Sequence, residues 1–253
     1  MGYVKWSYDT LNTFCHDVFR KFGFNEEQTN IIKDVLLTAD LYGIESHGMQ
    51  RMVRYDKGIE KGTIHPDAEP EVVFETPVSA VIDGHESTDA PAVLANIVGK
   101  KGGGIMPLGG NKEVNGSHKG YGYGMLCEIF SSILSMGVTS DKCCTFKDKT
   151  GICHGFAAID PAIFGNADDI KAHFSEYLET LRQSPKAEGA EQIYTHGEKE
   201  VLAEKERREN GIPVNDNTMV ELANLCNYLK IDFGAYFKDY ELPKDSKFFS
   251  GNY

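Results

Sequence analysis

The sequence is poor in long apolar runs and in positive charge. No hydrophobic stretch approaches the length of a bilayer span, so we expect no membrane-spanning helix. Lys and Arg number 26 against 38 Asp and Glu, which gives a formal net charge of -12. A surface this acidic repels phosphate backbones and anionic lipids, and we therefore expect neither nucleic-acid nor membrane binding.

The first residues lack the features of a targeting signal. They contain no apolar core of a signal peptide. Trp6 stands where an N-myristoylation motif requires Ser or Thr. These features predict a cytoplasmic protein.

The spacing of the cysteines does not form a recognisable metal or disulfide pattern. Of the six cysteines, Cys143 and Cys144 are adjacent and the others lie far apart. Together with Cys153 and His154 they lack the Cys-x-x-Cys pairs that are typical of a zinc site. We therefore expect reduced thiols, several of them buried, and no bound metal.

Standard nucleotide-binding motifs are also missing. The chain contains no P-loop, and the spacing of Gly120, Gly122 and Gly124 does not fit the dinucleotide fingerprint G-x-G-x-x-G. What is present is a glycine-rich loop that enters a helix at His118 and Lys119. Backbone N–H groups and an ammonium there could accept a diphosphate. A flexible loop that caps a buried helix explains the same pattern equally well.

The periodicity of the apolar residues predicts a mixed α/β (α+β) protein in which helical N- and C-terminal parts surround a reduced sheet. Ser7 and Asn25 are in place to cap the first two helices, and Gln28 completes a capping box with Asn25. We expect helices over residues 7–23, 25–43, 46–62, 91–98, 123–137, 166–184 and 217–229, and strands over 71–75, 79–84 and 155–160.

The segment YGIESHGMQRMVRY, residues 42–55, contains the strongest candidate for catalysis. If Ser46 caps a helix, His47 lies in its first turn, where the positive end of the helix dipole favours a neutral imidazole. Arg51 then projects from the same face one turn later. A guanidinium that holds a carboxylate beside an imidazole that exchanges a proton suits a 2-hydroxy or 2-oxo acid. Two ordinary solvated side chains on an exposed helix face would give the same spacing.

A second glycine turn, THGEKE at residues 195–200, precedes a charged helix. Glu198 is suited to bind ribose hydroxyls, and Lys199 to bind phosphate. By itself, however, this turn is a generic helix start.

Several segments together resemble one family, the type 2 malate/L-lactate dehydrogenases, which include the sulfolactate-dehydrogenase-like NAD(P)-dependent oxidoreductases. The matching segments, in order, are ADLYGIESHGMQRM, AVIDG, GGGIMPLGG, SHKGYGYGMLCEIFSSILSMG, GFAAIDPAIFG and THGEKEVLAEKERRENGIPV. They cover most of the chain.

The resemblance implies a fold that is not of the Rossmann type, a homodimer, and hydride transfer between NAD or NADP and a small 2-hydroxy or 2-oxo acid. It implies that His47 is the acid/base and that Arg51 holds the substrate carboxylate. The cofactor contacts that it implies are His118, Lys119, Gly197, Glu198 and Lys199.

The chain departs from the family pattern in its middle. Members of the family have a domain-sized block, with much of the nicotinamide-binding sheet, between the AVIDG strand and the loop before PLGG. Here residues 81–84 run almost directly into sequence that resembles the far side of that block. We therefore divide the chain into an N-terminal part (1–84), a glycine-rich connection where the block is missing (85–120) and a C-terminal part (121–253).

Two hypotheses follow. The first is an active dehydrogenase of the malate or lactate type. The second is a shortened, catalytically silent relative that retains dimerisation and partial nucleotide binding.

Overall fold

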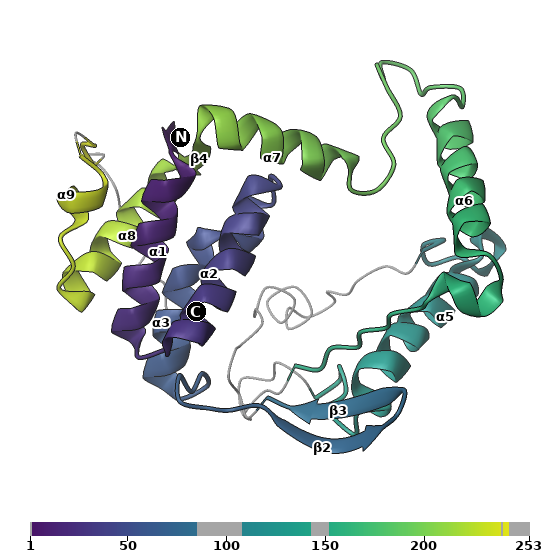
Figure 1. The fold of residues 1–253 in the computed structure, drawn as a ribbon, viewed down its shortest axis with the longest axis horizontal. Coiled ribbons are helices and arrows are strands. Elements are labelled where there is room, and N and C mark those ends of the chain that lie inside the picture. Colours follow the sequence, from purple (N-terminus) through teal and green to yellow (C-terminus); the bar gives the residue numbers. More distant parts are fainter. Residues whose placement is uncertain (1, 85–107, 143–151, 239, 243–253) are drawn as a thin grey trace. The chain divides into compact units, whose positions relative to one another are not determined.

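The computed structural model describes residues 2–84, 108–142, 152–238 and 240–242 (Figure 1). Contacts divide the chain into two compact units. The first comprises Met1–Arg54 and Ala158–Tyr253, and the second is Tyr55–Ala157. The sequence-based division at residues 84 and 120 concerns family correspondence rather than contacts and remains a prediction.

The first two helices begin and end where the sequence predicts. α1 (Tyr8–Phe22) is capped by the Ser7 side chain, which accepts the Thr10 N–H, and ends at Gly23 in the left-handed region. α2 (Glu26–Leu41) begins with the expected capping box. Local hydrogen bonds determine both starts, and such a cap is typically worth about 1 kcal/mol.

The hydrophobic core lies in the first unit. Two short antiparallel strands, β1 (Tyr3–Trp6) and β4 (Ile212–Asn215), pair the start of the chain with a segment more than 200 residues later. After β4 come α8 (Asp216–Leu229) and α9 (Phe233–Tyr236), which lie beside α1 (Figure 1). The largest fully buried side chains come from these elements, from α2 and from the segment that follows α2: Leu11, Phe14, Val18, Phe19, Leu37, Leu41, Met49, Met52, Ile212, Met219, Leu222 and Phe237.

Two further helices of the first unit are largely exposed. α6 (Ala167–Arg182) follows the short η5 turn (Pro161–Phe164), and α7 (Glu198–Asn210) precedes β4. We expected an apolar face of α6 to point inward, but none of its residues is buried, and Phe174 and Tyr177 are 58% and 57% exposed. Amphipathic periodicity identified the helix correctly, but no described element covers its apolar face.

The second unit is built from a hairpin and a helix. α3 (Met52–Lys61) leads into it, and the strands β2 (Glu71–Thr76) and β3 (Ser79–Asp83) pair antiparallel. The turn η3 (Glu113–Asn115) precedes α5 (Ser117–Glu128), which continues as one π-helical turn, η4 (Ile129–Ile133).

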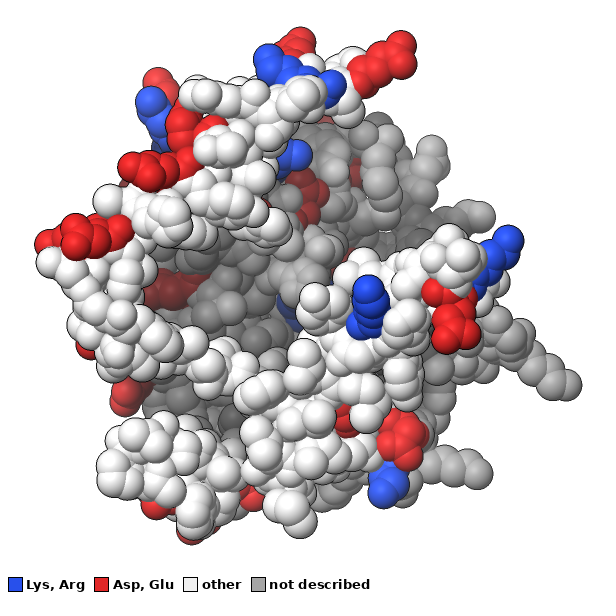
Figure 2. Space-filling view, turned by 90° about the vertical axis from the view of Figure 1, so that its right-hand side faces the viewer, with Lys and Arg blue, Asp and Glu red and all other residues white. Residues whose placement is uncertain are grey.

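Among its described residues, the second unit buries only one apolar side chain, Ile64. The face of α5 and η4 that we expected to be buried is open, with Phe130 62% and Leu134 61% exposed. In the view of Figure 2, charged residues are spaced apart among uncharged ones. The described residues of this unit therefore form no core of the usual size.

Two further expectations meet different outcomes. The strand predicted over residues 155–160 is wrong, because this segment has no regular structure and no described strand pairs with it. The helix predicted over 91–98 and the cysteines 143 and 144 lie outside the described residues.

The fold is nevertheless of the predicted class, mixed α/β with helices around small sheets. Across the described part of the chain, no helix has the length and apolarity that crossing a bilayer requires.

Candidate active site

His47 lies in a pair of short 3-10 turns. The turns η1 (Glu45–His47) and η2 (Met49–Arg51) are separated by Gly48, whose backbone is extended with φ -87° and ψ -153°. The prediction of a helix that starts at Ser46 was therefore wrong, since α3 begins only after η2. The argument that a helix dipole keeps the imidazole neutral does not apply here.

A buried carboxylate explains the break at Gly48. Asp40, at the end of α2, is only 4% exposed, and its Oδ2 accepts the Met49 N–H at 2.8 Å. A Cβ on Gly48 would lie 1.8 Å from Asp40 Oδ1, so only glycine allows the chain to approach this closely. The turn after His47 therefore wraps around the Asp40 side chain.

Burial also changes the acidity of this carboxyl group. It raises the pKa of Asp40 to about 7, although the Met49 N–H and the Arg207 guanidinium act in the opposite direction. Asp40 therefore titrates near neutral pH, directly behind the turn that carries His47.

Ser46 joins the two candidate catalytic residues. Its Oγ lies 2.9 Å from His47 Nδ1, and its carbonyl oxygen accepts the Arg51 Nε–H at 2.5 Å. His47 is exposed and Arg51 is half-buried. The structure thus brings His47 and Arg51 together through the serine between them rather than through a shared helix face.

Arg207 of α7 supports the same turn from the other side. Its Nη1 donates to the backbone carbonyl of Asp40 at 2.5 Å, and its Nη2 lies 3.7 Å from Glu45 Oε1. The side chain is only 14% exposed, so this ion pair is shielded from solvent. The turn is therefore held at both ends, through Glu45 and through Met49.

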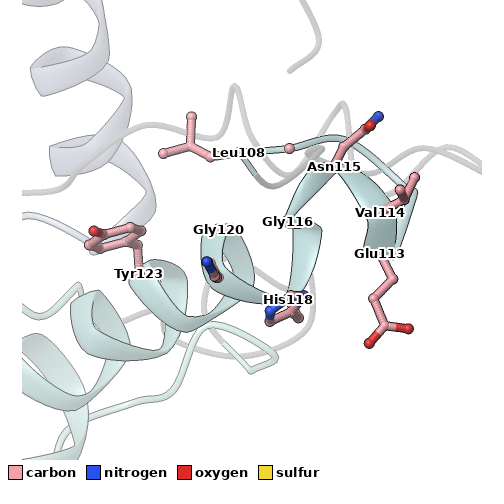
Figure 3. Close-up of a pocket in the computed structure, with 10 residues that line it drawn as sticks. Leu108, Glu113, Val114, Asn115, Gly116, His118, Gly120 and Tyr123 are labelled. Carbon is pink, nitrogen blue, oxygen red and sulfur yellow. The ribbon is translucent and has the colours of Figure 1, made fainter.

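His118 and Lys119 occupy the first turn of α5, where the sequence predicted them at a helix entrance. They line a cavity of about 500 Å³, a volume within the usual range for small-molecule sites. In Figure 3, His118 and Tyr123 project from α5, and Glu113 projects from the preceding turn. Both basic side chains are exposed to solvent.

Glycines shape this cavity by allowing a loop to lie against the helix. A Cβ on Gly120 would lie 1.9 Å from the Leu108 carbonyl oxygen, and Gly109 has a φ of +90°. Gly122 and Gly124, in contrast, have nothing within 4 Å of an added Cβ. Of the glycines around Gly-Tyr-Gly, only Gly120 has a steric requirement.

The Gly197–Lys199 turn starts α7, as predicted, but its charged residues are engaged locally. Glu198 Oε2 accepts the Thr195 N–H and Oε1 accepts the Arg182 Nε–H, both at 2.6 Å. The Thr195 N–H, followed by Arg182, lowers the pKa of Glu198. Lys199 Nζ lies 5.0 Å above the Tyr194 ring.

This turn is at the opposite end of α7 from Arg207. Glu198 and Arg207 are nine positions apart in the sequence, which corresponds to roughly 13 Å along a helix axis. His118 and Lys119 belong to the second unit, and His47 and Arg51 belong to the first.

Sequence reasoning missed Asp40 and Arg207, and it gave Ser46 only a capping role. The sequence contains a partial signal for Asp40: an acidic residue among the apolar positions near the end of a helix has to be accommodated by hydrogen bonds. Arg207 has no such signal, because it lies in a helix with charges on all sides.

Comparison with known proteins now decides the family. The family model described as malate/L-lactate dehydrogenase matches residues 6–88 and 83–223. The chain belongs to the malate/L-lactate dehydrogenase family. The two matches overlap at residues 83–88, where the sequence led us to expect a missing block.

Two relatives, both dehydrogenases, match different shares of the chain. Malate dehydrogenase of Pyrococcus horikoshii is 25% identical over 349 aligned positions, which cover 91% of this chain and 97% of the relative. Because 349 exceeds the 253 residues of the chain, the relative has residues without counterparts here. L-sulfolactate dehydrogenase of Methanocaldococcus jannaschii is 41% identical over 85 residues, 34% of this chain and 23% of that protein.

Solved structures agree on the fold. That of malate dehydrogenase from Pyrococcus horikoshii OT3 gives a TM-score of 0.77 at 24% identity and covers 91% of this chain and 97% of that one. That of sulfolactate dehydrogenase from Methanocaldococcus jannaschii gives 0.71 at 20% identity, covering 93% and 100%. The family membership supports an oxidoreductase of the hydroxy-acid dehydrogenase type, with a small hydroxy or oxo acid as substrate.

Proposed function

We propose that the protein is an NAD(P)-dependent dehydrogenase that interconverts a small 2-hydroxy acid and its 2-oxo acid, of the malate or lactate type. The observation that carries this proposal is the Ser46-centred arrangement, in which one serine contacts both His47 and Arg51. Family membership provides the reaction class, and the arrangement provides the residues that perform it.

His47 acts as the acid/base. In reduction, the imidazolium gives its Nε2 proton to the oxygen of the 2-oxo acid as the hydride arrives, and the ring becomes neutral with its remaining proton on Nδ1, which donates to Ser46 Oγ. In the reverse direction, Nε2 of the neutral ring accepts the hydroxyl proton of the 2-hydroxy acid. The exposure of the ring is consistent with access to substrate.

Arg51 binds the substrate carboxylate. A guanidinium is planar and matches the two oxygens of a carboxylate. The bond from its Nε to the Ser46 carbonyl holds it next to His47. When the carboxylate is bound there, the oxygen on the neighbouring carbon, C2 of the acid, lies near the imidazole.

The residues at α5 suit the phosphate part of the nicotinamide cofactor. His118 and Lys119 supply positive charge at the start of a helix, next to the cavity of about 500 Å³. In our proposal the cofactor has a second contact with the turn formed by Gly197, Glu198 and Lys199. Hydrogen bonds from Arg182 and Thr195 fix the position of the Glu198 side chain. The cofactor, when bound, supplies or accepts the hydride.

A second candidate function has its own support. The chain is shorter than its relatives, and the second unit buries little apolar surface in its described residues. These observations favour a shortened, catalytically silent relative. It would keep dimerisation and bind the nucleotide only in part.

Turnover distinguishes the two candidates. The purified protein is mixed with NADH or NADPH and with oxaloacetate, pyruvate or 3-sulfopyruvate, and the absorbance at 340 nm is followed. An active enzyme consumes the reduced cofactor, and His47→Gln abolishes this, whereas His173→Gln, an exposed histidine on α6, does not. Absence of turnover with every pair contradicts the dehydrogenase and supports the silent relative.

We also propose that the protein is a cytoplasmic homodimer. The open apolar faces of α5, η4 and α6 support an assembly that covers them.

A further inference from the structure

We infer that Asp40 is the positioning residue of the site: its side chain sets the backbone that follows His47 and thereby the orientation of the imidazole. The inference rests on the proposed function, since it concerns the same site. Asp40 lies seven residues before His47 on a different element, α2, and it touches the turn only from inside the protein.

Three contacts made by this one residue carry the inference. Its Oδ2 accepts the Met49 N–H at 2.8 Å, its Oδ1 occupies the place of a side chain on Gly48, and its carbonyl oxygen accepts Arg207 Nη1. The peptide after His47 therefore has little freedom to rotate while the Asp40 side chain remains in place.

The effect reaches the imidazole through one residue of backbone. His47 is bonded directly to Gly48, so the extended conformation of Gly48 determines the direction in which the η1 turn presents its last side chain. The contact between Ser46 Oγ and His47 Nδ1 requires that direction. Without the Asp40 carboxyl, Gly48 is free to adopt other conformations and the serine–histidine contact is no longer enforced.

The first experiment measures the imidazole directly and needs no activity. Long-range ¹H–¹⁵N spectra report the tautomer of His47, whose signal is assigned by its loss in His47→Gln. We expect one dominant tautomer in the wild type and a mixture in Asp40→Ala. Asp40→Asn, which keeps an oxygen acceptor for the Met49 N–H, should lie closer to the wild type. Asp34→Asn, an exposed acid on the same helix, is the matched control and should change nothing.

The second experiment uses turnover. We expect Asp40→Ala to lower kcat by about 100-fold, the size of effect that a small misplacement of a catalytic group produces. The affinity for NADH should be unchanged. A wild type without turnover contradicts the proposed function, whereas the tautomer spectra still decide the role of Asp40.

A double substitution tests whether the close approach of Gly48 to the Asp40 carboxyl positions His47. Gly48→Ala should disturb the tautomer and lower kcat, and Gly48→Ala combined with Asp40→Gly should be less impaired in its tautomer than Gly48→Ala alone, because the clash has been removed. If Asp40→Ala does not fold, Asp40→Asn and Gly48→Ala carry the test. Two results overturn the inference. One is a folded Asp40→Ala variant whose His47 tautomer is the same as in the control Asp34→Asn. The other is a double variant whose tautomer change equals the sum of the changes in the two single variants.

Discussion

At the scale of the residue, Asp40 is where burial and charge oppose each other most strongly. A carboxyl group that is 4% exposed ionises at a cost, and the pKa of about 7 expresses that cost. The charged groups that act on the Asp40 carboxyl are Arg207 and Glu45. Burial raises the pKa of the nearby Cys15 thiol, and the charge of Asp40 raises it further.

This pKa predicts how stability depends on pH. Between about pH 4 and pH 7, the Asp40 carboxyl is protonated in the folded protein but ionised in the unfolded chain. The free energy of unfolding therefore falls as the pH rises through this range. Relative to Asp40→Asn, the wild type should lose about 3 kcal/mol of unfolding free energy between pH 5 and pH 8. Urea denaturation of the wild type and of Asp40→Asn at both pH values measures this change in unfolding free energy. Parallel pH profiles would contradict the raised pKa.

Arg51 gives a second prediction at the same scale. Arg51→Ala removes the proposed carboxylate ligand, so the KM for the 2-oxo acid should rise at least about 10-fold, as expected for a lost charge-assisted hydrogen bond. The affinity for NADH should change little. The control is Arg54→Ala, three residues further along in α3. Equal losses of both affinities would count against the assigned role.

At the scale of the element, the start of α5 depends on close packing. The loop at Leu108 touches the helix only because Gly120 has no side chain, whereas Gly122, two residues later, faces open space. Two glycines of one helix therefore have different requirements.

We expect Gly120→Ala to displace the Leu108 loop, distort the cavity at His118 and weaken NADH binding by about 10-fold or more, since a Cβ at 1.9 Å forces the backbone to move. Gly122→Ala is the matched control and should stabilise the helix by up to about 1 kcal/mol without affecting binding. Fluorescence titration with NADH and thermal unfolding measure the two effects. Identical behaviour of both variants would show that the loop does not shape the binding site.

At the scale of the whole molecule, large apolar side chains stay exposed on α5, η4 and α6, among them Phe130 at 62% and Phe174 at 58%. The sequence predicts these faces by their periodicity, yet the described residues of a single chain do not cover them. Association of chains is the proposed way to cover them.

Sedimentation equilibrium at micromolar concentration should therefore report a mass near twice the 28.1 kDa of the chain. Replacing Phe174 and Tyr177 by Ser should shift the population towards monomer if α6 contributes to the interface. Replacing Lys171 and His173 on the same helix by Ala should not. A wild type that remains monomeric at these concentrations contradicts the homodimer.

The sequence by itself determined the helices whose ends are local. Ser7, Asn25 and Asn166 accept N–H groups within three residues of themselves, so the starts of α1, α2 and α6 are visible as short motifs. It also determined the family, because motifs such as Ser-His-Gly retain their order along the chain. It identified His47 and Arg51 as a pair for the same reason.

Only the tertiary structure decided how that pair is held. The 3-10 turns around Gly48 depend on Asp40, and the support of Glu45 depends on Arg207, which is 162 residues away along the chain. Helical spacing cannot reveal contacts between distant segments, because desolvation and steric exclusion arise only after α2 and α7 have packed together. For the same reason, periodicity found the apolar faces of α5 and α6 but not whether the chain itself covers them.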